Sequence, residues 1–262
     1  MIRDYEDFKK YVFQTTSIDL NAYKERQMKR RIDALIARNK FDGYDSYSKA
    51  LTSDKVLLDE FVNYLTINVS EFYRNPALWK TLEDVILPDL IKKIGENVKI
   101  WSAACSTGDE PYSLAMVLAK KIPLRKIKII ATDIDDQVLQ KAKDGVYGNA
   151  SVKGLPQDLL NKHFEKMGDR FYKISDEIKN CVEFKKSNLL KDPYPTGCHL
   201  IVCRNVVIYF TEEAKHDIYY KFNKSLVNGG CLFVGNTEQI INHKDLGYDF
   251  DQLFFYRKVK EL

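Results

Sequence analysis

The sequence has few cysteines, few histidines and no long apolar run, and each scarcity excludes a class of protein. Its five cysteines are scattered, odd in number and without a C-x-x-C pair, which excludes a disulfide framework and favours reduced thiols in a cytosolic protein. The four histidines form no ligand-spaced cluster, so we expect no metal. The N-terminus is charged and no apolar run approaches membrane-spanning length, so we expect neither a signal peptide nor a transmembrane helix.

Net charge is also small, but it is concentrated in one segment. The whole chain carries +4, whereas Lys24–Lys40 holds seven basic residues against two acidic ones, a net +5. The same segment has an apolar stripe at helical spacing, formed by Met28, Ile32, Leu35 and Ile36. The basic side chains opposite this stripe or on its flanks are Arg26, Lys29, Arg30 and Arg31. The charge alone suits either a binding face for an acidic partner or a solvated helix face.

The periodicity divides the chain into two regions. Residues 1–67 show helical spacing and predict a small helical bundle. From Lys80 onward short β-branched strands alternate with helices, which predicts an α/β fold with a doubly wound, Rossmann-like parallel sheet. The expected strands are 98–102, 127–133, 182–188, 200–205, 231–235 and a closing strand within 252–259. The expected helices are 112–121, 136–144 and 212–225.

One stretch breaks this alternation. Residues 146–186 are too long and too strand-like for a single crossover helix. They predict a short helix plus a small antiparallel β-subdomain, inserted before the third main strand and serving recognition rather than catalysis.

The most informative segment is the strand, turn and helix start at Trp101–Ser113, an order that opens a nucleotide-type α/β site. Its turn has a single glycine, Gly108, and lacks the G-x-G-x-x-G spacing that closes around a pyrophosphate. Instead it places an acidic pair, Asp109 and Glu110, at the mouth of the expected pocket. Two carboxylates repel phosphates and attract an amine or a sulfonium, which favours S-adenosylmethionine.

Polar side chains follow the other strands, and each has a structural alternative. Asp133 is placed to accept ribose hydroxyls, and we favour this over a helix N-cap, for which Asp135 competes. Asn188 and Leu189 stand where an adenine edge can be bonded, and an ordinary Asn turn is an equally good interpretation. Glu110 either meets the positive end of the ligand or simply occupies the first turn of its helix.

Two further segments add candidates. After the fourth strand, Arg204 and Asn205 are expected to point into the crevice, with Tyr209 within reach. The alternatives are a structural ion pair for Arg204 and core packing for Tyr209. The segment that joins the two regions has polar residues alternating with apolar ones, as if one edge faced a site: Asn68, Ser70 and Arg74.

Four blocks of the sequence, in order and at matching spacing, resemble the motifs of the chemotaxis receptor methyltransferase family over essentially the whole chain. They are Thr66–Arg74 (T-x-N-x-[ST]-x-F-[FY]-R), Trp101–Ser113 (W-S-A-A-x-S-T-G-[DE]-E-P-Y-S), Thr132–Asp135 and Cys203–Phe210 (C-R-N-V-x-I-Y-F). The departures are small: Ser70 replaces a common Thr, Asp109 a common Glu, and Gly235–Glu238 stands for a G-x-[ST]-E pattern.

That family methylates glutamates of bacterial chemoreceptors and converts S-adenosylmethionine to S-adenosylhomocysteine. The resemblance implies a receptor-docking helical domain at 1–67, a methyltransferase domain at 68–262 and the insert at 146–186. It implies cofactor contacts at Asn68, Ser70, Arg74, Glu110, Asp133, Asn188, Leu189 and Arg204, to which we add Ala104 and Asn205. Arg74 and Tyr209 are expected nearest the reacting carboxylate, with Arg74 orienting either substrate or cofactor. Receptor docking is expected to involve Arg26, Lys29, Arg30 and Arg31.

The resemblance also implies a cytoplasmic enzyme that is recruited to receptor arrays at the membrane. We expect a monomer that inserts into no membrane and binds no nucleic acid. Some family members grip a peptide at the receptor's C-terminus, but the stretch between Phe164 and Phe184 looks shorter here and lacks their glycine-rich loop, so we expect a tether-independent enzyme.

The main alternative is a regulator that senses a nucleotide and binds nucleic acid through its basic helix. It is disfavoured because no helix-turn-helix pattern is evident and the cofactor motifs are complete. Methylation of RNA or DNA is a second alternative. It is disfavoured because Arg204-Asn-Val-Val stands where base-amine methyltransferases have a proline-aromatic motif.

Overall fold

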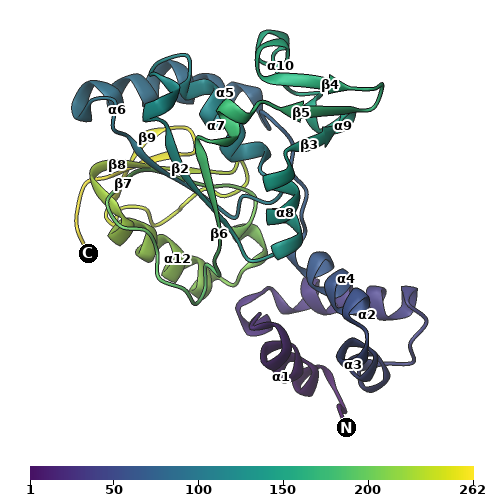
Figure 1. Cartoon of the computed structure of the whole chain (residues 1–262). Helices are drawn as coiled ribbons and strands as arrows, with labels where there is room; N and C mark the ends of the chain where they lie inside the picture. Colours follow the sequence, from purple (N-terminus) through teal and green to yellow (C-terminus); the bar gives the residue numbers. More distant parts are fainter. The chain divides into compact units, whose positions relative to one another are not determined.

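The computed structural model describes all residues, 1–262, and the chain forms two compact units (Figure 1). The first unit is built from residues 1–68 together with 209–215, and the second from 69–208 together with 216–262. Each unit is therefore discontinuous in sequence, because the chain leaves the first unit at residue 68 and returns to it at residue 209.

The first unit is all helical, as the periodicity predicts. Its elements are α1 (Tyr5–Thr16), η1 (Leu20–Ala22), α2 (Glu25–Arg38), α3 (Tyr44–Ser53) and α4 (Lys55–Thr66). Asp4 caps α1 and Asp54 caps α4, since each side chain accepts a hydrogen bond from an N–H in the first helical turn. The apolar stripe of α2 is buried as predicted. The rings of Phe8, Tyr47 and Phe61 are fully buried and pack against one another at the centre of the helical unit.

A short return segment completes the first unit. The Thr211 N–H donates to the Ala22 carbonyl at 2.8 Å, and the Lys24 N–H donates to the Tyr209 carbonyl at 2.9 Å. Between these bonds the Phe210 ring packs edge-on against Tyr23, with 4.8 Å between the ring centroids. Backbone pairing and ring packing together bind residues 209–211 into the helical unit.

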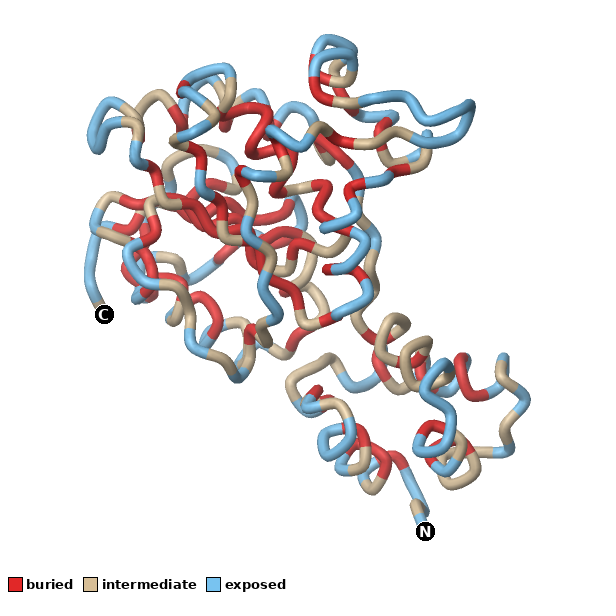
Figure 2. The backbone as a smooth tube through the Cα atoms, in the orientation of Figure 1, coloured by how far each residue is buried: buried red, intermediate tan, exposed pale blue.

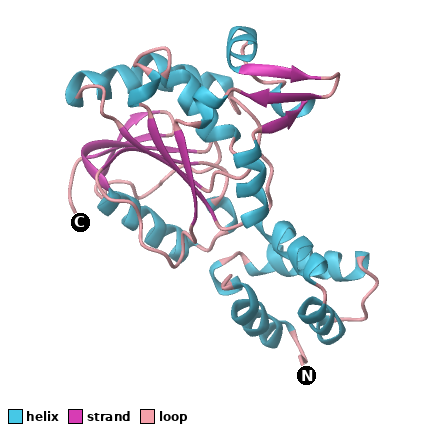
Figure 3. Cartoon of the chain, viewed as in Figure 1, coloured by secondary structure: helices cyan, strands magenta, loops and turns pink.

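The second unit is built on a seven-stranded sheet with the order β6-β2-β1-β7-β8-β10-β9 (Figure 3). Its strands are β1 (Lys99–Ala103), β2 (Lys128–Asp133), β6 (Val182–Lys186), β7 (Cys198–Cys203), β8 (Leu226–Val234), β9 (Tyr248–Gln252) and β10 (Phe255–Lys258). Neighbouring strands from β6 to β8 run parallel, and β10 and β9 are antiparallel. The predicted α/β class is confirmed, and only β9 has no counterpart among the predicted strands.

Helices cover both faces of this sheet. The run formed by α5 (Pro76–Thr81), η2 (Leu82–Ile86) and α6 (Leu87–Ile94) shares one core cluster with α7 (Asp109–Leu118) and with Ile100, Val202 and Phe233 of the sheet. On the opposite face, the ring of Phe222 in α12 (Glu212–Ser225) lies 5.4 Å from that of Trp101. Figure 2 shows buried residues concentrated along the central strands, and β1, β7 and β8 are correspondingly rich in apolar residues.

The connections between strands hold the remaining main-chain elements, η3 (Leu124–Lys126), α8 (Asp136–Asp144) and η4 (Val207–Tyr209). Helices α8 and α12 lie at their predicted positions, whereas α7 begins and ends three residues earlier than predicted. None of the helices has the length and apolarity of a membrane span.

An inserted subdomain lies between α8 and β6. It consists of β3 (Val146–Gly148), α9 (Asn149–Val152), α10 (Gln157–His163), β4 (Phe164–Met167), β5 (Phe171–Ile174) and α11 (Asp176–Lys179). Strands β3, β5 and β4 form a three-stranded antiparallel sheet, as predicted. The predicted range 146–186 is too long at its carboxyl end, because Val182–Lys186 pairs with β2 in the large sheet.

Candidate active site

The site begins at the carboxyl end of β1, because the strand order reverses between β1 and β7, where α/β sheets bind ligands. The turn after β1 is tightly wound: Ala104, Ser106 and Gly108 have positive φ angles of 62°, 48° and 88°. A non-glycine residue in this region costs about 1–3 kcal/mol, and such strain clusters at ligand sites. At Gly108 a side chain is also excluded by space, because an added Cβ would lie 2.9 Å from the Cβ of Ala142.

Asp133 holds this turn from the end of β2. Its Oδ2 accepts a hydrogen bond from the Ser106 N–H at 2.8 Å, and its Oδ1 accepts one from the Asp135 N–H at 3.1 Å. Asp135 is the residue that caps α8, by accepting a hydrogen bond from the Gln137 N–H, which removes the N-cap alternative for Asp133. Burial raises the pKa of Asp133 to about 6.

Glu110 and Arg204 meet at the ends of β1 and β7. The Ser102 hydroxyl donates to Glu110 Oε1 at 2.8 Å, and Arg204 Nη1 lies 3.8 Å from Glu110 Oε2. Burial raises the pKa of Glu110 to about 7, while Arg204 opposes the rise. Glu110 is therefore a largely desolvated carboxylate with a single, loosely held cationic neighbour within ion-pair distance. It is suited to accept a cationic group from a ligand.

Arg204 also ties the 69–75 segment to β7. Its Nη2 donates to the Arg74 carbonyl at 2.7 Å and to Asn75 Oδ1 at 3.0 Å. Tyr73 and Asn75 both have positive φ angles, 54° and 63°, so Arg74 lies at a sharp bend. The Arg74 guanidinium turns back and donates to the Val69 carbonyl at 3.3 Å. Arg204 is thus a buried anchor of the bend that carries Arg74.

The two members of the predicted acidic pair have different environments. Asp109 is fully buried, and its Oδ1 accepts a hydrogen bond at 2.6 Å from the Ser151 hydroxyl of α9 in the inserted subdomain. Burial raises the pKa of Asp109, and the hydroxyls of Ser151, Thr107 and Ser70 oppose that rise. The prediction that both carboxylates lie at the mouth of a pocket is therefore wrong for Asp109. The Ser70 hydroxyl, predicted to contact the cofactor, hydrogen-bonds this carboxylate.

Asn188 and Leu189 lie just beyond β6 in a tight turn. Asn188 Oδ1 accepts a hydrogen bond from the Leu190 N–H at 2.9 Å, and the Asn188 N–H donates to Asp192 at 2.8 Å. Leu189 is buried, and its carbonyl accepts the Tyr194 hydroxyl at 2.6 Å. The Asn turn, one of the two interpretations from sequence, is present. In it the side-chain oxygen of Asn188 is already hydrogen-bonded to the backbone of Leu190.

Two protein-family models together match almost the whole chain. The model described as "CheR methyltransferase, all-alpha domain" matches residues 3–66, and "CheR methyltransferase, SAM binding domain" matches residues 68–252. The chain belongs to the CheR methyltransferase family. Its cofactor is S-adenosylmethionine, and the resemblance seen in the sequence motifs is confirmed.

Relatives of this CheR-family chain span its length. It is 43% identical to the chemotaxis protein methyltransferase of Listeria monocytogenes serovar 1/2a, and 42% identical to that of Listeria innocua serovar 6a. Each alignment covers 98% of this chain and 98% of the relative. The chemotaxis protein methyltransferase of Borreliella burgdorferi is 33% identical over 91% of this chain and 89% of its own length. The chain is therefore an S-adenosylmethionine-dependent methyltransferase of chemotaxis.

The residues at this edge of the sheet fit that cofactor. Asp133 at the end of β2 and Glu110 in the first turn of α7 are largely desolvated carboxylates, suited to hydroxyl donors and to an amino group respectively. Ala104, at the start of the turn, is partly exposed and has no side chain beyond Cβ, which permits close approach to the backbone. The fit thus rests on the carboxylates of Asp133 and Glu110. Their hydrogen bonds and the Arg204 charge offset only part of the cost of removing them from water.

Two other predicted site residues of this CheR-family chain lie in the first unit. The Asn68 side-chain amide donates to Asn63 Oδ1 at 3.0 Å and to the Thr66 hydroxyl at 2.8 Å, at the end of α4. Tyr209 lies in η4, where its carbonyl accepts the hydrogen bond from Lys24. Both are therefore held by contacts of the helical unit.

The four basic residues predicted for docking differ in what they contact. Arg26 and Arg30 are exposed on α2. Lys29 pairs with Asp33 one turn along the same helix, at 2.9 Å. Arg31 donates to the Tyr64 carbonyl at 2.7 Å and lies over the Tyr64 ring at 4.6 Å. It therefore satisfies a carbonyl in the last turn of α4, a structural role that the helical wheel did not predict.

Sequence reasoning missed the backbone anchor at the end of β7. Glu238, only 4% exposed, follows β8 and accepts hydrogen bonds from backbone N–H groups of the turn that contains Asn205. The available signal was the Gly235–Glu238 pattern, to which no role was assigned.

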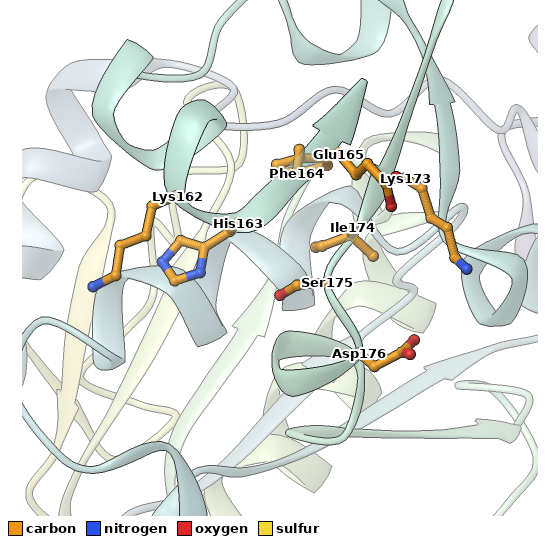
Figure 4. A pocket seen from close by; sticks show the side chains of 8 residues that line it. All are labelled: Lys162, His163, Phe164, Glu165, Lys173, Ile174, Ser175 and Asp176. Atoms are coloured by element: carbon orange, nitrogen blue, oxygen red, sulfur yellow. The ribbon is translucent and has the colours of Figure 1, made fainter. Parts of the chain in front are cut away.

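The inserted subdomain has a separate pocket of about 270 Å³ where α10, β4, β5 and α11 meet (Figure 4). His163 and Ser175 both line it, and His163 is 3% exposed. Burial lowers the pKa of His163, so its ring is neutral at pH 7. None of the predicted cofactor residues lines this pocket.

Proposed function

We propose that this chain methylates glutamate side chains of bacterial chemoreceptors, forming glutamate methyl esters. The observation that carries the proposal is membership of the CheR family along the whole chain, together with relatives named chemotaxis protein methyltransferase. The chemistry of the acceptor supports it. A solvated glutamate has a pKa of about 4.3, so the nucleophile is already ionised and no general base is required.

The roles of the cofactor residues follow from their chemistry. S-adenosylmethionine supplies a methyl group that is already activated by its sulfonium. Glu110 is assigned to its amino group and Asp133 to its ribose hydroxyls, because these desolvated carboxylates lie in the first turn of α7 and at the end of the neighbouring strand β2. Arg204 and Asn205 are assigned to the edge of the same site at the end of β7. What the chain contributes to the rate is positioning, which supplies about 7–11 kcal/mol in favourable cases.

Arg74 and Tyr209 are assigned to the glutamate acceptor. A guanidinium offsets the desolvation of the carboxylate, and a phenol can donate a hydrogen bond to one of its oxygens. Too strong an ion pair would weaken the nucleophile. The bond from Arg74 to the Val69 carbonyl occupies part of the guanidinium, which supports an orienting role rather than full neutralisation.

Receptor docking is assigned to the exposed basic side chains of α2. Arg26 and Arg30 face solvent, and a positive face of this kind steers an acidic helical partner toward the enzyme. Lys29 contributes charge next to its partner Asp33, whereas Arg31 supports α4.

We further propose that this enzyme needs no C-terminal receptor tether. The hairpin of β4 and β5 is closed by residues 168–170 alone, so it has no extended glycine-rich loop. Titration of a receptor C-terminal peptide into the protein tests this. Clear micromolar binding would contradict it.

Methyl transfer from radiolabelled S-adenosylmethionine to a purified chemoreceptor cytoplasmic fragment tests the function itself. We expect label that mild base releases as methanol, since a carboxyl methyl ester is base-labile, and that Arg74→Ala fails to introduce. Absence of label in the presence of measurable cofactor binding would contradict the proposal, and RNA would be the next acceptor to test.

A further inference from the structure

A carboxylate outside the predicted site anchors the end of β7. Glu238 Oε2 accepts hydrogen bonds from the Asn205 N–H at 2.6 Å and from the Gly235 N–H at 2.8 Å. Its Oε1 accepts hydrogen bonds from the Val207 N–H at 2.9 Å and from the Ile208 N–H at 3.3 Å. One side chain thus satisfies four backbone donors, three of which belong to the turn directly after Arg204.

These donors need a partner. Asn205 has a positive φ of 60°, so the chain turns sharply after β7 and its N–H groups leave the strand ladder. Buried N–H groups without a partner each cost about 1–3 kcal/mol. The carboxylate is the acceptor that allows this conformation of residues 205–208.

Gly235 makes room for the carboxylate. A Cβ at this position would lie 2.5 Å from Glu238 Oε2 and 2.9 Å from the Asn205 N. Burial raises the pKa of Glu238, and its four backbone hydrogen bonds oppose the rise. The Gly235–Glu238 pattern therefore has a physical reason: the glycine admits the carboxylate, and the carboxylate fixes the turn.

We infer that Glu238 is a positioning residue for methyl transfer, which fixes the 205–208 turn and thereby the placement of Arg204 and Asn205 at the end of β7. Arg204 in turn holds the carbonyl of Arg74. The inference rests on the proposed assignment of these residues to the site.

Glu238→Gln tests the inference with little change in shape. It turns one oxygen into an NH₂ group that faces two N–H donors, so two of the four bonds are lost. A displacement of about 1 Å in a positioned group can cost about 100-fold in rate, so we expect kcat on the receptor fragment to fall about 10- to 100-fold. The KM for the receptor stays unchanged, because the docking residues of α2 are untouched.

A matched control separates positioning from stability. Asn223 is fully buried, and its amide donates to the carbonyls of Leu246 and Lys260, away from the β7 turn. Asn223→Ala should lower the melting temperature but leave kcat of the folded protein unchanged. Gly235→Ala repeats the test with the carboxylate retained but displaced, should Glu238→Gln fail to fold.

The affinity for S-adenosylmethionine can be measured without any receptor. This measurement therefore tests the role of Glu238 independently of which acceptor the enzyme methylates. We expect Glu238→Gln or Gly235→Ala to weaken S-adenosylmethionine binding about tenfold, which is equivalent to about 1.4 kcal/mol. Asn223→Ala should leave this affinity unchanged. If the folded Glu238→Gln and Gly235→Ala proteins keep the affinity and kcat of the parent chain, the inference is overturned. Failure of the parent chain to label the receptor bears only on the proposed function.

Discussion

At the scale of single residues, two independent features favour glycine at position 108, in the turn after β1: its backbone conformation and the lack of space for a side chain. Its φ is 88°, and an added Cβ would lie 2.9 Å from Ala142 and 3.1 Å from the Tyr147 hydroxyl. We expect Gly108→Ala to lower the free energy of unfolding by about 3 kcal/mol, the sum of backbone strain and overpacking. Urea denaturation followed by circular dichroism measures this change.

Gly197→Ala is the matched control for that substitution. Gly197 has a φ of 68°, but nothing lies within 4 Å of an added Cβ. It should therefore show only the backbone component, about 1 kcal/mol. Equal losses for the two variants would mean that the close packing around Gly108 contributes nothing.

If Glu110 binds the amino group of the cofactor as proposed, we expect cofactor binding to depend on pH. Burial raises the pKa of Glu110 to about 7, and only the ionised form attracts an amino group. The ionised fraction falls as the pH drops through this value, so the dissociation constant for S-adenosylmethionine should rise, approaching tenfold for each further pH unit. Isothermal titration calorimetry between about pH 6 and pH 8 measures it.

Glu110→Gln gives the reference for this titration. Its affinity should be lower at pH 8 and nearly constant down to about pH 6.5, where Asp133, with a pKa of about 6, begins to contribute. A pH dependence that persists unchanged in Glu110→Gln would assign the effect to another group.

At the scale of elements, the basic residues of α2 fall into two groups: Arg26 and Arg30 are exposed and proposed for docking, whereas Arg31 contacts α4. Reversing the two exposed charges, Arg26→Glu with Arg30→Glu, should raise the KM for the receptor fragment about tenfold at low ionic strength, and less in high salt. Cofactor affinity should not change. Initial methylation rates across a salt series measure both effects.

Two variants control for net charge and for helix stability. Lys10→Glu with Lys49→Glu makes the same change in net charge at exposed positions of α1 and α3, and should leave the KM unchanged. Arg31→Ala removes the hydrogen bond to Tyr64 and should lower stability by about 1 kcal/mol without any salt-dependent KM effect. If all three proteins show the same rise in KM, α2 has no special role in docking.

Whether a contact could be predicted depended on whether it lies within one element or between distant ones. The α2 stripe, the turn at Gly108 and the place of Asp133 follow from local spacing, and the structure contains them. Ser151, which binds Asp109, and Tyr64, which binds Arg31, each lie more than 30 residues from their partner in the sequence. Periodicity tells which face a side chain occupies but not which distant group meets it. For this reason the sequence wrongly predicts Asp109 at the mouth of the pocket and does not reveal the backbone partners of Glu238.

At the scale of the whole molecule, the helical unit is not a separable N-terminal piece. Residues 209–215 belong to it, and Phe210, 3% exposed, packs against Tyr23. A chain that begins at residue 68 loses this partner together with the carbonyl acceptor at Ala22. We expect such a chain to keep its sheet but to associate, because an apolar ring and unpaired backbone become exposed. Size-exclusion chromatography with light scattering measures this association.

Phe210→Ser in the truncated chain provides the comparison. If the exposed ring drives association, this substitution should restore a monodisperse species. A truncated chain that is monomeric without the substitution would show that the return segment does not depend on the helices.

The return of the chain at residue 209 also limits how the helical unit can be exchanged between homologues. A chimera made at one crossover near residue 68 would join foreign helices to a resident 209–215 segment, so the pairings with Ala22, Tyr23 and Lys24 would come from two different parents. A graft that preserves them must carry both pieces. A recombinant that carries both foreign pieces in a resident chain needs three crossovers, near residues 68, 208 and 215. The proposed docking residues on the exposed face of α2 can instead change one at a time.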